Sequence, residues 1–140
     1  MRFMVLVKAD ATSEAGVLPS EAMLLKMGKF NEELVKAGIM LAGEGLHPSS
    51  KGARIDLTGA KPVVTDGPFS ETKELLAGFW MIQVKSKEEA IEWFKKCPPE
   101  ARTIEIRQIF DSADFAPVIE TDEGRALLAA EDEFRKRTGT

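Results

Sequence analysis

The chain has 140 residues, of which 44% are hydrophobic and 30% are charged, and its formal net charge is −4. This length allows one domain, residues 1–140, with a hydrophobic core that needs neither disulfides nor a structural metal. The negative net charge argues against a nucleic-acid-binding surface, which requires clustered Lys and Arg side chains.

The amino terminus and the single cysteine indicate a cytoplasmic location. The apolar run at residues 3–7 is too short for a secretory signal, and no stretch has the length of a membrane span. Cys97 has no partner for an intrachain disulfide, which is typical of a reducing compartment. We therefore expect a cytoplasmic protein that does not contact a membrane.

The first part of the chain predicts a strand, a helix and a second strand. Residues 2–7 are apolar on both alternating faces, as in a central strand that is covered on two sides. After a loop, Ser20 is the expected N-cap of a helix that ends at Gly38. Apolar residues recur at helical spacing along it: Met23, Met27, Phe30, Leu34 and Ala37. Residues 39–43 form the second predicted strand, and a loop with His47 follows it.

The middle of the chain predicts a hairpin followed by a tight turn. Residues 53–57 and 61–65 flank a short turn, as in a β-hairpin. In the next turn, Asp66-Gly67-Pro68, an Asp can bond the backbone, a Gly accepts positive φ and a Pro restricts φ. We expect the ring of Phe69 to be buried as an anchor under this turn, with the polar residues 70–74 at the surface.

The second half adds a strand, a helix and a final strand. Residues 77–84 are again apolar on both faces. Ser86 and Glu89 fit a capping box at the start of the second helix, which ends at Pro98 and Pro99. Residues 103–109 alternate between apolar and polar side chains, as in a strand with two different faces.

A third helix extends the chain beyond a core of about residues 1–115. Thr121 and Asp122 begin this helix, which spans about residues 121–138. Its basic end complements the negative end of the helix dipole.

Without the hairpin, the predicted order is strand, helix, strand, strand, helix, strand. This is the ferredoxin-like split βαβ sandwich, an α+β fold with an inserted β-hairpin and a C-terminal helix. Two helices can cover only one face of its sheet. Because two strands are apolar on both faces, we expect a second copy of the chain to cover the open face in a symmetric homodimer.

The residues around the tight turn resemble a known family. The string Val-Thr-Asp-Gly-Pro-Phe at 64–69, continued by residues 70–74 and by Gly78-Phe79, resembles the DGPF-domain branch of the YCII-related proteins. Supporting matches lie at residues 41–46, 89–93 and 104–107. Together these matches extend the resemblance over about residues 1–115.

The resemblance implies a dimeric α/β barrel. For the wider YCII-related group, it implies acid/base chemistry at a His in the first helix with an Asp nearby. This chain has no His in that helix, and its only His is His47. Related genes are sometimes linked with extracytoplasmic-function sigma factors, so the resemblance also implies a signalling partner.

His47 and Asp66 are the candidate catalytic residues. His47 is the only side chain whose ordinary pKa lies near neutrality, which suits a general acid or base; the alternative is an ordinary loop residue. Asp66 could orient His47 or act as its partner acid, or it could bond only the amides of its turn. We expect both side chains on one wall of a pocket, with Arg107 on its floor.

Four residues are candidates for substrate binding. Arg107 and Glu105 project from the sheet face away from the helices, where Arg107 could bind a carboxylate or phosphate of a small anionic ligand; an intersubunit salt bridge is the alternative. Glu71 and Lys73 follow the tight turn. One His and one Cys do not form a transition-metal site, and Gly43-Glu44-Gly45 lacks the third glycine of a dinucleotide loop. We expect neither a metal nor a cofactor.

Two functions follow from these patterns. The first is a small-molecule enzyme or binding protein, with acid/base chemistry in a cleft between the sheet and residues 64–76. The second is a non-catalytic regulatory or interaction module, connected through the resemblance with sigma-factor signalling. A deep pocket with converging polar groups would favour the first, and a shallow turn with its polar atoms bonded to backbone would favour the second.

Overall fold

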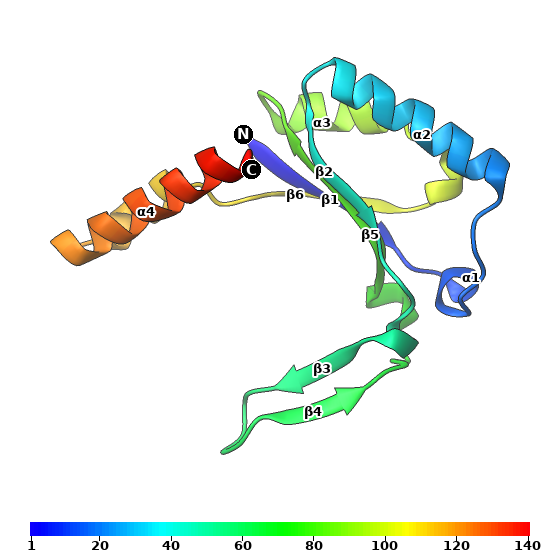
Figure 1. Cartoon of the computed structure of the whole chain (residues 1–140), viewed down its shortest axis with the longest axis horizontal. Coiled ribbons are helices and arrows are strands. Elements are labelled where there is room, and N and C mark those ends of the chain that lie inside the picture. The colour runs from blue at the N-terminus through cyan, green and yellow to red at the C-terminus, as the bar shows by residue number, and fades with distance from the viewer.

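The computed structural model describes all 140 residues as a mixed α+β fold with two antiparallel sheets and a C-terminal helix (Figure 1). The larger sheet has the strand order β2-β5-β1-β6. Its strands are β1 (Arg2–Lys8), β2 (Met40–Gly45), β5 (Leu76–Gln83) and β6 (Ile104–Gln108). The long helices α2 (Glu21–Lys36) and α3 (Lys87–Phe94) connect them. The predicted order of strands and helices is therefore confirmed for this sheet.

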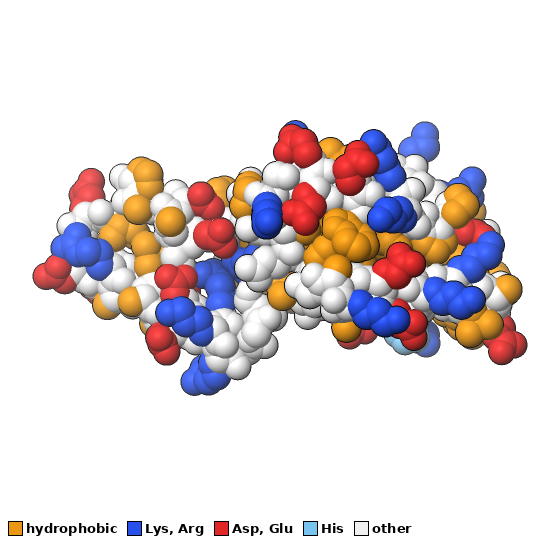
Figure 2. All heavy atoms as spheres, turned by 90° about the horizontal axis from the view of Figure 1, so that it is seen from above, with side chains coloured by type: hydrophobic (Ala, Val, Ile, Leu, Met, Phe, Trp, Pro, Cys, Tyr) orange, Lys and Arg blue, Asp and Glu red, His pale blue; other side chains and the backbone are white.

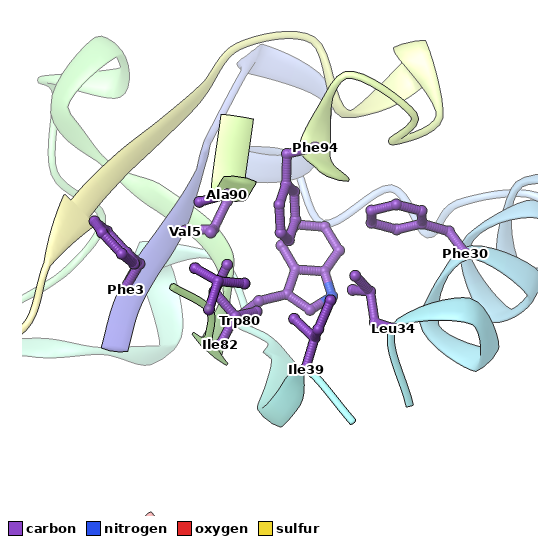
Figure 3. Packing of buried hydrophobic residues seen from close by; sticks show 10 residues of the cluster. Phe3, Val5, Phe30, Leu34, Ile39, Trp80, Ile82, Ala90 and Phe94 are labelled. Carbon is purple, nitrogen blue, oxygen red and sulfur yellow. The ribbon is translucent and has the colours of Figure 1, made fainter. Parts of the chain in front are cut away.

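Both connecting helices cover the same face of the sheet. Phe3 pairs with Ile82 and Val5 with Trp80 across β1 and β5, so these four side chains share one face. They form one buried cluster with side chains of both helices (Figure 3). Its members are Phe3, Val5, Phe30, Leu34, Ile39, Trp80, Ile82, Val84, Ala90 and Phe94.

Trp80 lies at the centre of this core. Its ring packs edge-to-face against Phe30 and Phe94, with ring centroids 6.1 and 5.1 Å away. Its Nε1–H donates a hydrogen bond of 2.8 Å to Oδ1 of Asn31 on α2. The indole therefore buries its apolar body while its polar atom is satisfied, and it holds α2 against the sheet.

The opposite face of the sheet has no helix over it. Met4 pairs with Met81 and Leu6 with Phe79, and all four side chains are only partly buried. The single chain forms an open four-stranded sheet rather than a closed barrel. The homodimer expected to cover this face stays a prediction.

Two segments project from the body on the side of the sheet opposite α2 and α3 (Figure 1). The strands β3 (Ala53–Asp56) and β4 (Val63–Asp66) pair only with each other, and all their residues are exposed. The arm (residues 110–140) contains the 3-10 helix η4 (Ser112–Val118) and α4 (Asp122–Thr138), which has no buried residue. Figure 2 shows the arm as a lobe apart from the body, and charges of both signs mixed over the visible face.

Arg2 fastens the arm to the sheet. Its side chain is one of two buried polar side chains. Its guanidinium donates to the Phe110 carbonyl oxygen at 2.9 Å and to the Asp111 carboxylate at 3.1 Å. It also donates to the carbonyl oxygen of Thr140, the last residue, at 3.4 Å. Both chain ends consequently lie together (Figure 1).

Most predicted helix starts are confirmed. Ser20 accepts a hydrogen bond from the Met23 amide at 3.1 Å, and Thr121 accepts one from the Gly124 amide at 3.0 Å. At Ser86, one of the two hydrogen bonds of the predicted capping box is present, because the Ser86 hydroxyl accepts from the Glu89 amide. The other was predicted wrongly: the Glu89 carboxylate accepts from the amide of Lys85, not from that of Ser86.

The sequence predicts a loop before α2, but part of that segment is a short helix. The helix α1 (Ala11–Glu14) begins with a capping box in which Asp10 accepts from the Ser13 amide and the Ser13 hydroxyl accepts from the Asp10 amide. Three short 3-10 helices also follow strands or turns: η1 (Ser49–Lys51), η2 (Thr72–Glu74) and η3 (Pro99–Ala101).

The tight turn at residues 66–69 packs directly on η1. The Gly67 amide donates to the Gly52 carbonyl oxygen at 3.0 Å. A Cβ atom at Gly67 would lie only 1.7 Å from the Ser49 carbonyl oxygen. Gly67 does not have positive φ, so the sequence prediction was wrong about its reason: glycine is required here by a close approach of two backbones.

Ser49 joins three connecting segments. Its hydroxyl accepts from the Phe69 amide at 3.0 Å and donates to a Glu14 carboxylate oxygen at 2.5 Å, while its own amide donates to the other oxygen of Glu14 at 3.1 Å. The Phe69 ring is half-buried and lies outside the core, with the guanidinium of Arg54 3.8 Å from its centroid. The expected buried plug is thus replaced by a hydrogen bond and a cation–π contact.

No helix of the chain has the length and apolarity needed to cross a membrane.

Replacement of a fully buried residue of α2 should test this core. Leu34 is 0% exposed, so Leu34→Ala should lower the free energy of unfolding by about 3 kcal/mol through lost burial and a cavity. Leu25→Ala on the same helix removes a side chain that is 60% exposed and should change it by less than about 0.5 kcal/mol. Urea unfolding of both variants measures the difference, and equal values would contradict the described packing of α2.

Replacement of Gly67 should test the contact between the turn and η1. Gly67→Ala places a methyl group against the Ser49 carbonyl and should destabilise the chain by about 1–3 kcal/mol. Gly59→Ala is the control, because the nearest atom to its Cβ is the Lys61 carbonyl oxygen at 3.9 Å. Thermal unfolding compares them. If both variants melt at the wild-type temperature, the two backbones do not touch at Gly67.

Candidate binding cavity

A cavity of about 860 Å³ lies where β1 and β2 end and β5 begins. Its wall is mainly apolar. Residues of the sheet and of the first half of α2 line it, together with the segment before that helix: Val7, Leu18, Met23, Leu24, Met27 and Trp80. Met23 and Met27 continue the helical stripe of the buried Phe30 and Leu34, yet both are only partly buried. The second half of α2 therefore packs on the sheet, and its first half covers the cavity.

Charged groups of both signs also line the cavity, and several have ion-pair partners. The pairs are Lys8 with Glu105 at 3.6 Å, Arg102 with Asp10 at 3.3 Å, and Glu100 with Lys26 at 2.6 Å. The Ser13 backbone amide and the Arg102 guanidinium lower the pKa of Asp10. The Lys26 ammonium, by its hydrogen bond, lowers the pKa of Glu100. Both acids are therefore ionised at neutral pH.

His47 lines the cavity from the loop after β2. On one side of it, the Leu46 amide donates to the Ala77 carbonyl oxygen at 2.8 Å and continues the pairing of β2 with β5. On the other side is η1, which Glu14 holds through Ser49. The exposed imidazole forms no hydrogen bond within the chain. The protein thus positions the backbone of His47 from both sides and leaves its ring free.

The other two residues of the expected acid/base site lie elsewhere in the chain. Asp66 is exposed at the end of β4, where it pairs with Ala53, and it does not line this cavity. Arg107 is exposed on the open face beside Met4 and does not line it either. The cavity of one chain therefore does not bring His47, Asp66 and Arg107 to one wall, because the hairpin carries Asp66 away. Their catalytic roles stay a prediction.

The remaining candidates lie outside the cavity. Glu105 touches its edge only through the ion pair with Lys8. Glu71 accepts from Arg54 at 3.2 Å, and its own backbone amide together with that guanidinium lowers its pKa. Lys73 is exposed on η2 without an ion pair.

The sequence reading missed Asn31 and Arg102 as cavity residues. Asn31 had a signal, because it is a polar residue at helical spacing from Met27 and Leu34 on an otherwise apolar stripe. Arg102 had none: it lies in a backbone conformation with positive φ, which nothing in the sequence around an Arg predicts.

The arrangement of side chains supports neither metal binding nor nucleophilic chemistry at the single cysteine. No group of three or more His, Cys, Asp or Glu side chains is placed to hold a metal ion. Burial, with a smaller effect of the Glu100 charge, raises the pKa of Cys97 to about 11. This thiol is therefore protonated at neutral pH and is a poor nucleophile.

Comparison with known proteins assigns the chain to a family. The YCII-related domain matches residues 1–113, which include the whole larger sheet, the cavity and the hairpin. An uncharacterised protein of Rhizobium meliloti (strain 1021) is 28% identical over 92 residues, which cover 64% of this chain and 74% of that protein. Because the matched domain covers well over half of the sequence, the chain belongs to the family of YCII-related domains.

Proposed function

We propose that the chain binds a small organic ligand in the cavity and that His47 exchanges a proton with it. The observation that carries this proposal is the convergence of apolar side chains and a single free imidazole on a cavity of about 860 Å³. Small-molecule sites commonly have volumes of about 300–1,000 Å³, mainly apolar walls and a few polar groups that orient the ligand.

The cavity wall supports this reading in detail. The methionines of α2 are flexible and polarizable, which suits contact with an irregular apolar ligand. Asn31 uses Oδ1 for Trp80 and keeps its amide donors for a ligand. A carboxylate from Asp66 or a guanidinium from Arg107 could join His47 only from a second chain.

A homodimer is part of this proposal, with the open faces of two sheets closing a dimeric α/β barrel. The half-buried Met4, Leu6, Phe79 and Met81 support it, because they form an apolar centre on a face that no helix covers. The hairpin and the arm extend on that side, where they would flank a second copy (Figure 1). The string at residues 64–69 supports the finer assignment to the DGPF branch of the family.

A non-catalytic interaction module is the second candidate function. It is favoured by exposed apolar side chains on the projecting segments, namely Ile55 and Val64 on the hairpin and Leu127 and Phe134 on the arm. The suggestion of a sigma-factor partner rests on the resemblance alone.

Trp80 and His47 provide two direct probes of ligand binding. In a Trp93→Phe background, Trp80 is the only tryptophan, and it lines the cavity. We expect 8-bromooctan-1-ol, whose bromine quenches an indole in contact, to quench Trp80 saturably. The same titration should shift the imidazole NMR signal, which is a single one because the chain has one His.

A matched pair of leucines on α2 provides the control. Leu24 lines the cavity and is 58% exposed, whereas Leu25 does not line it and is 60% exposed. Leu24→Glu should weaken binding by about tenfold or more, since it places a charge against an apolar ligand. Leu25→Glu should leave it unchanged. Quenching that does not saturate, or equal effects of both substitutions, would overturn the proposed function.

The dimer has a separate test. Light scattering at micromolar concentration should give twice the mass of one chain. Met81→Glu places a charge at the centre of the open face and should give monomers, whereas Leu25→Glu on the far side of the helical layer should not. A wild-type monomer under these conditions contradicts the dimer.

A further inference from the structure

Arg102 has an unusual backbone conformation at the rim of the cavity. Its φ is 63° and its ψ is −104°, and it is the only residue other than glycine with positive φ. For a residue with a Cβ atom, this region is sterically strained. The conformation is imposed from both sides: the Arg102 amide donates to the Pro99 carbonyl oxygen at 3.0 Å, and the carbonyl of Thr103 accepts from the Lys8 amide at 3.2 Å.

Glycine would adopt this conformation without strain, so the arginine side chain has to be explained by what it contacts. Arg102 lines the cavity, and its side chain is 71% exposed. Its one contact within the chain is a single hydrogen bond of 3.3 Å from Nη1 to Oδ2 of Asp10. The other N–H groups of its fork point to no partner in the chain and can bind an oxyanion.

The acids near Arg102 are held by other groups. Asp10 accepts from the Ser13 amide at 2.8 Å through Oδ1, so the carboxylate caps α1 whether or not Arg102 is present. Glu100 is paired with Lys26 at 2.6 Å. Lys8 also lines the cavity, and its ammonium is paired with Glu105 at 3.6 Å. This end of the cavity therefore offers the Arg102 guanidinium to an anion.

The opposite end of the cavity is at His47. Arg102 lies just before β6 and His47 follows β2, with β5 and β1 between these two strands. Three strand spacings separate the two ends by ~14 Å. The lining between them includes Trp80 of β5 and Met27 of α2. A ligand that reaches both ends must therefore be elongated and mainly apolar.

We infer that the cavity takes an elongated apolar carboxylate and that Arg102 binds its carboxylate group. This inference rests on the proposed function and names its ligand class. The ligand carboxylate replaces Asp10 at the guanidinium, and the apolar part lies over β5 and extends toward His47. Hydrogen bonds on both sides fix the backbone of Arg102 before the ligand arrives, which reduces the ordering required on binding.

A pair of probes of equal length tests the role of charge. In the Trp93→Phe background, 8-bromooctanoate and 8-bromooctan-1-ol differ only in the carboxylate, and each quenches Trp80 when bound. We expect the carboxylate to bind at least tenfold more tightly at pH 7. If neither probe binds, the proposed function fails. If both bind equally, the cavity function stands and the inference about its ligand class is wrong.

Substitutions at Arg102 and Asp10 test the residue assignment. Arg102→Gly should raise the melting temperature, because it removes the strain, and should abolish the preference for the carboxylate while binding of the alcohol persists. Asp10→Asn keeps an N-cap acceptor but removes the competing charge, so it should tighten binding of the carboxylate several-fold and leave the alcohol unchanged. Arg125→Gln on α4, which removes a cation outside the cavity, is the control and should keep the preference.

Arg102→Lys provides a second variant with the same charge and should retain part of the preference, because an ammonium lacks the planar fork. A preference that survives Arg102→Gly, or that is lost equally in Arg125→Gln, would overturn the assignment of the carboxylate to Arg102.

Discussion

The contact between Trp80 and the second half of α2 determines most of this architecture. The edges of Phe30 and Phe94 and the hydrogen bond to Asn31 hold the indole, so the second half of α2 packs on the sheet. Before Phe30, Met27 packs against the edge of the core, and Met23 and Met27 line the cavity. The same helix thus closes the core with one half and covers a cavity with the other.

The tight turn at residues 66–69 acts on the cavity indirectly. Its contacts are with η1, through Gly67 and through the bond from Phe69 to Ser49, and η1 is the segment that directly follows His47 and Pro48. Glu14 fastens the same serine from α1, which also lines the cavity through Ser13. The turn at residues 66–69 therefore has a structural role: through η1 it supports the loop that carries His47.

The fold could be predicted from the sequence because buried residues recur with the period of a helix or a strand. The site could not, because its residues lie in segments without such a period. Phe30, Leu34, Trp80 and Ile82 recur at the spacing of a helix or strand, so their elements and their common core could be predicted. Asp66 and His47 both lie in connections, whose paths depend on long-range contacts such as Gly67 against Ser49. The hairpin pairs with itself rather than folding over the cavity, and no local pattern in the sequence distinguishes these two outcomes.

The hydrogen bond from Arg2 to Thr140 brings the two chain ends close enough to be joined. The amino terminus begins the central strand β1, and the guanidinium of its second residue bonds the final carbonyl, so the two ends are neighbours (Figure 1). A short linker can therefore join them, and new ends can be opened in the exposed turn between β3 and β4, which pairs with nothing in the larger sheet. Such a circularly permuted chain would retain every strand pairing of the larger sheet and the whole cavity, while freeing the projecting hairpin as two independent tails.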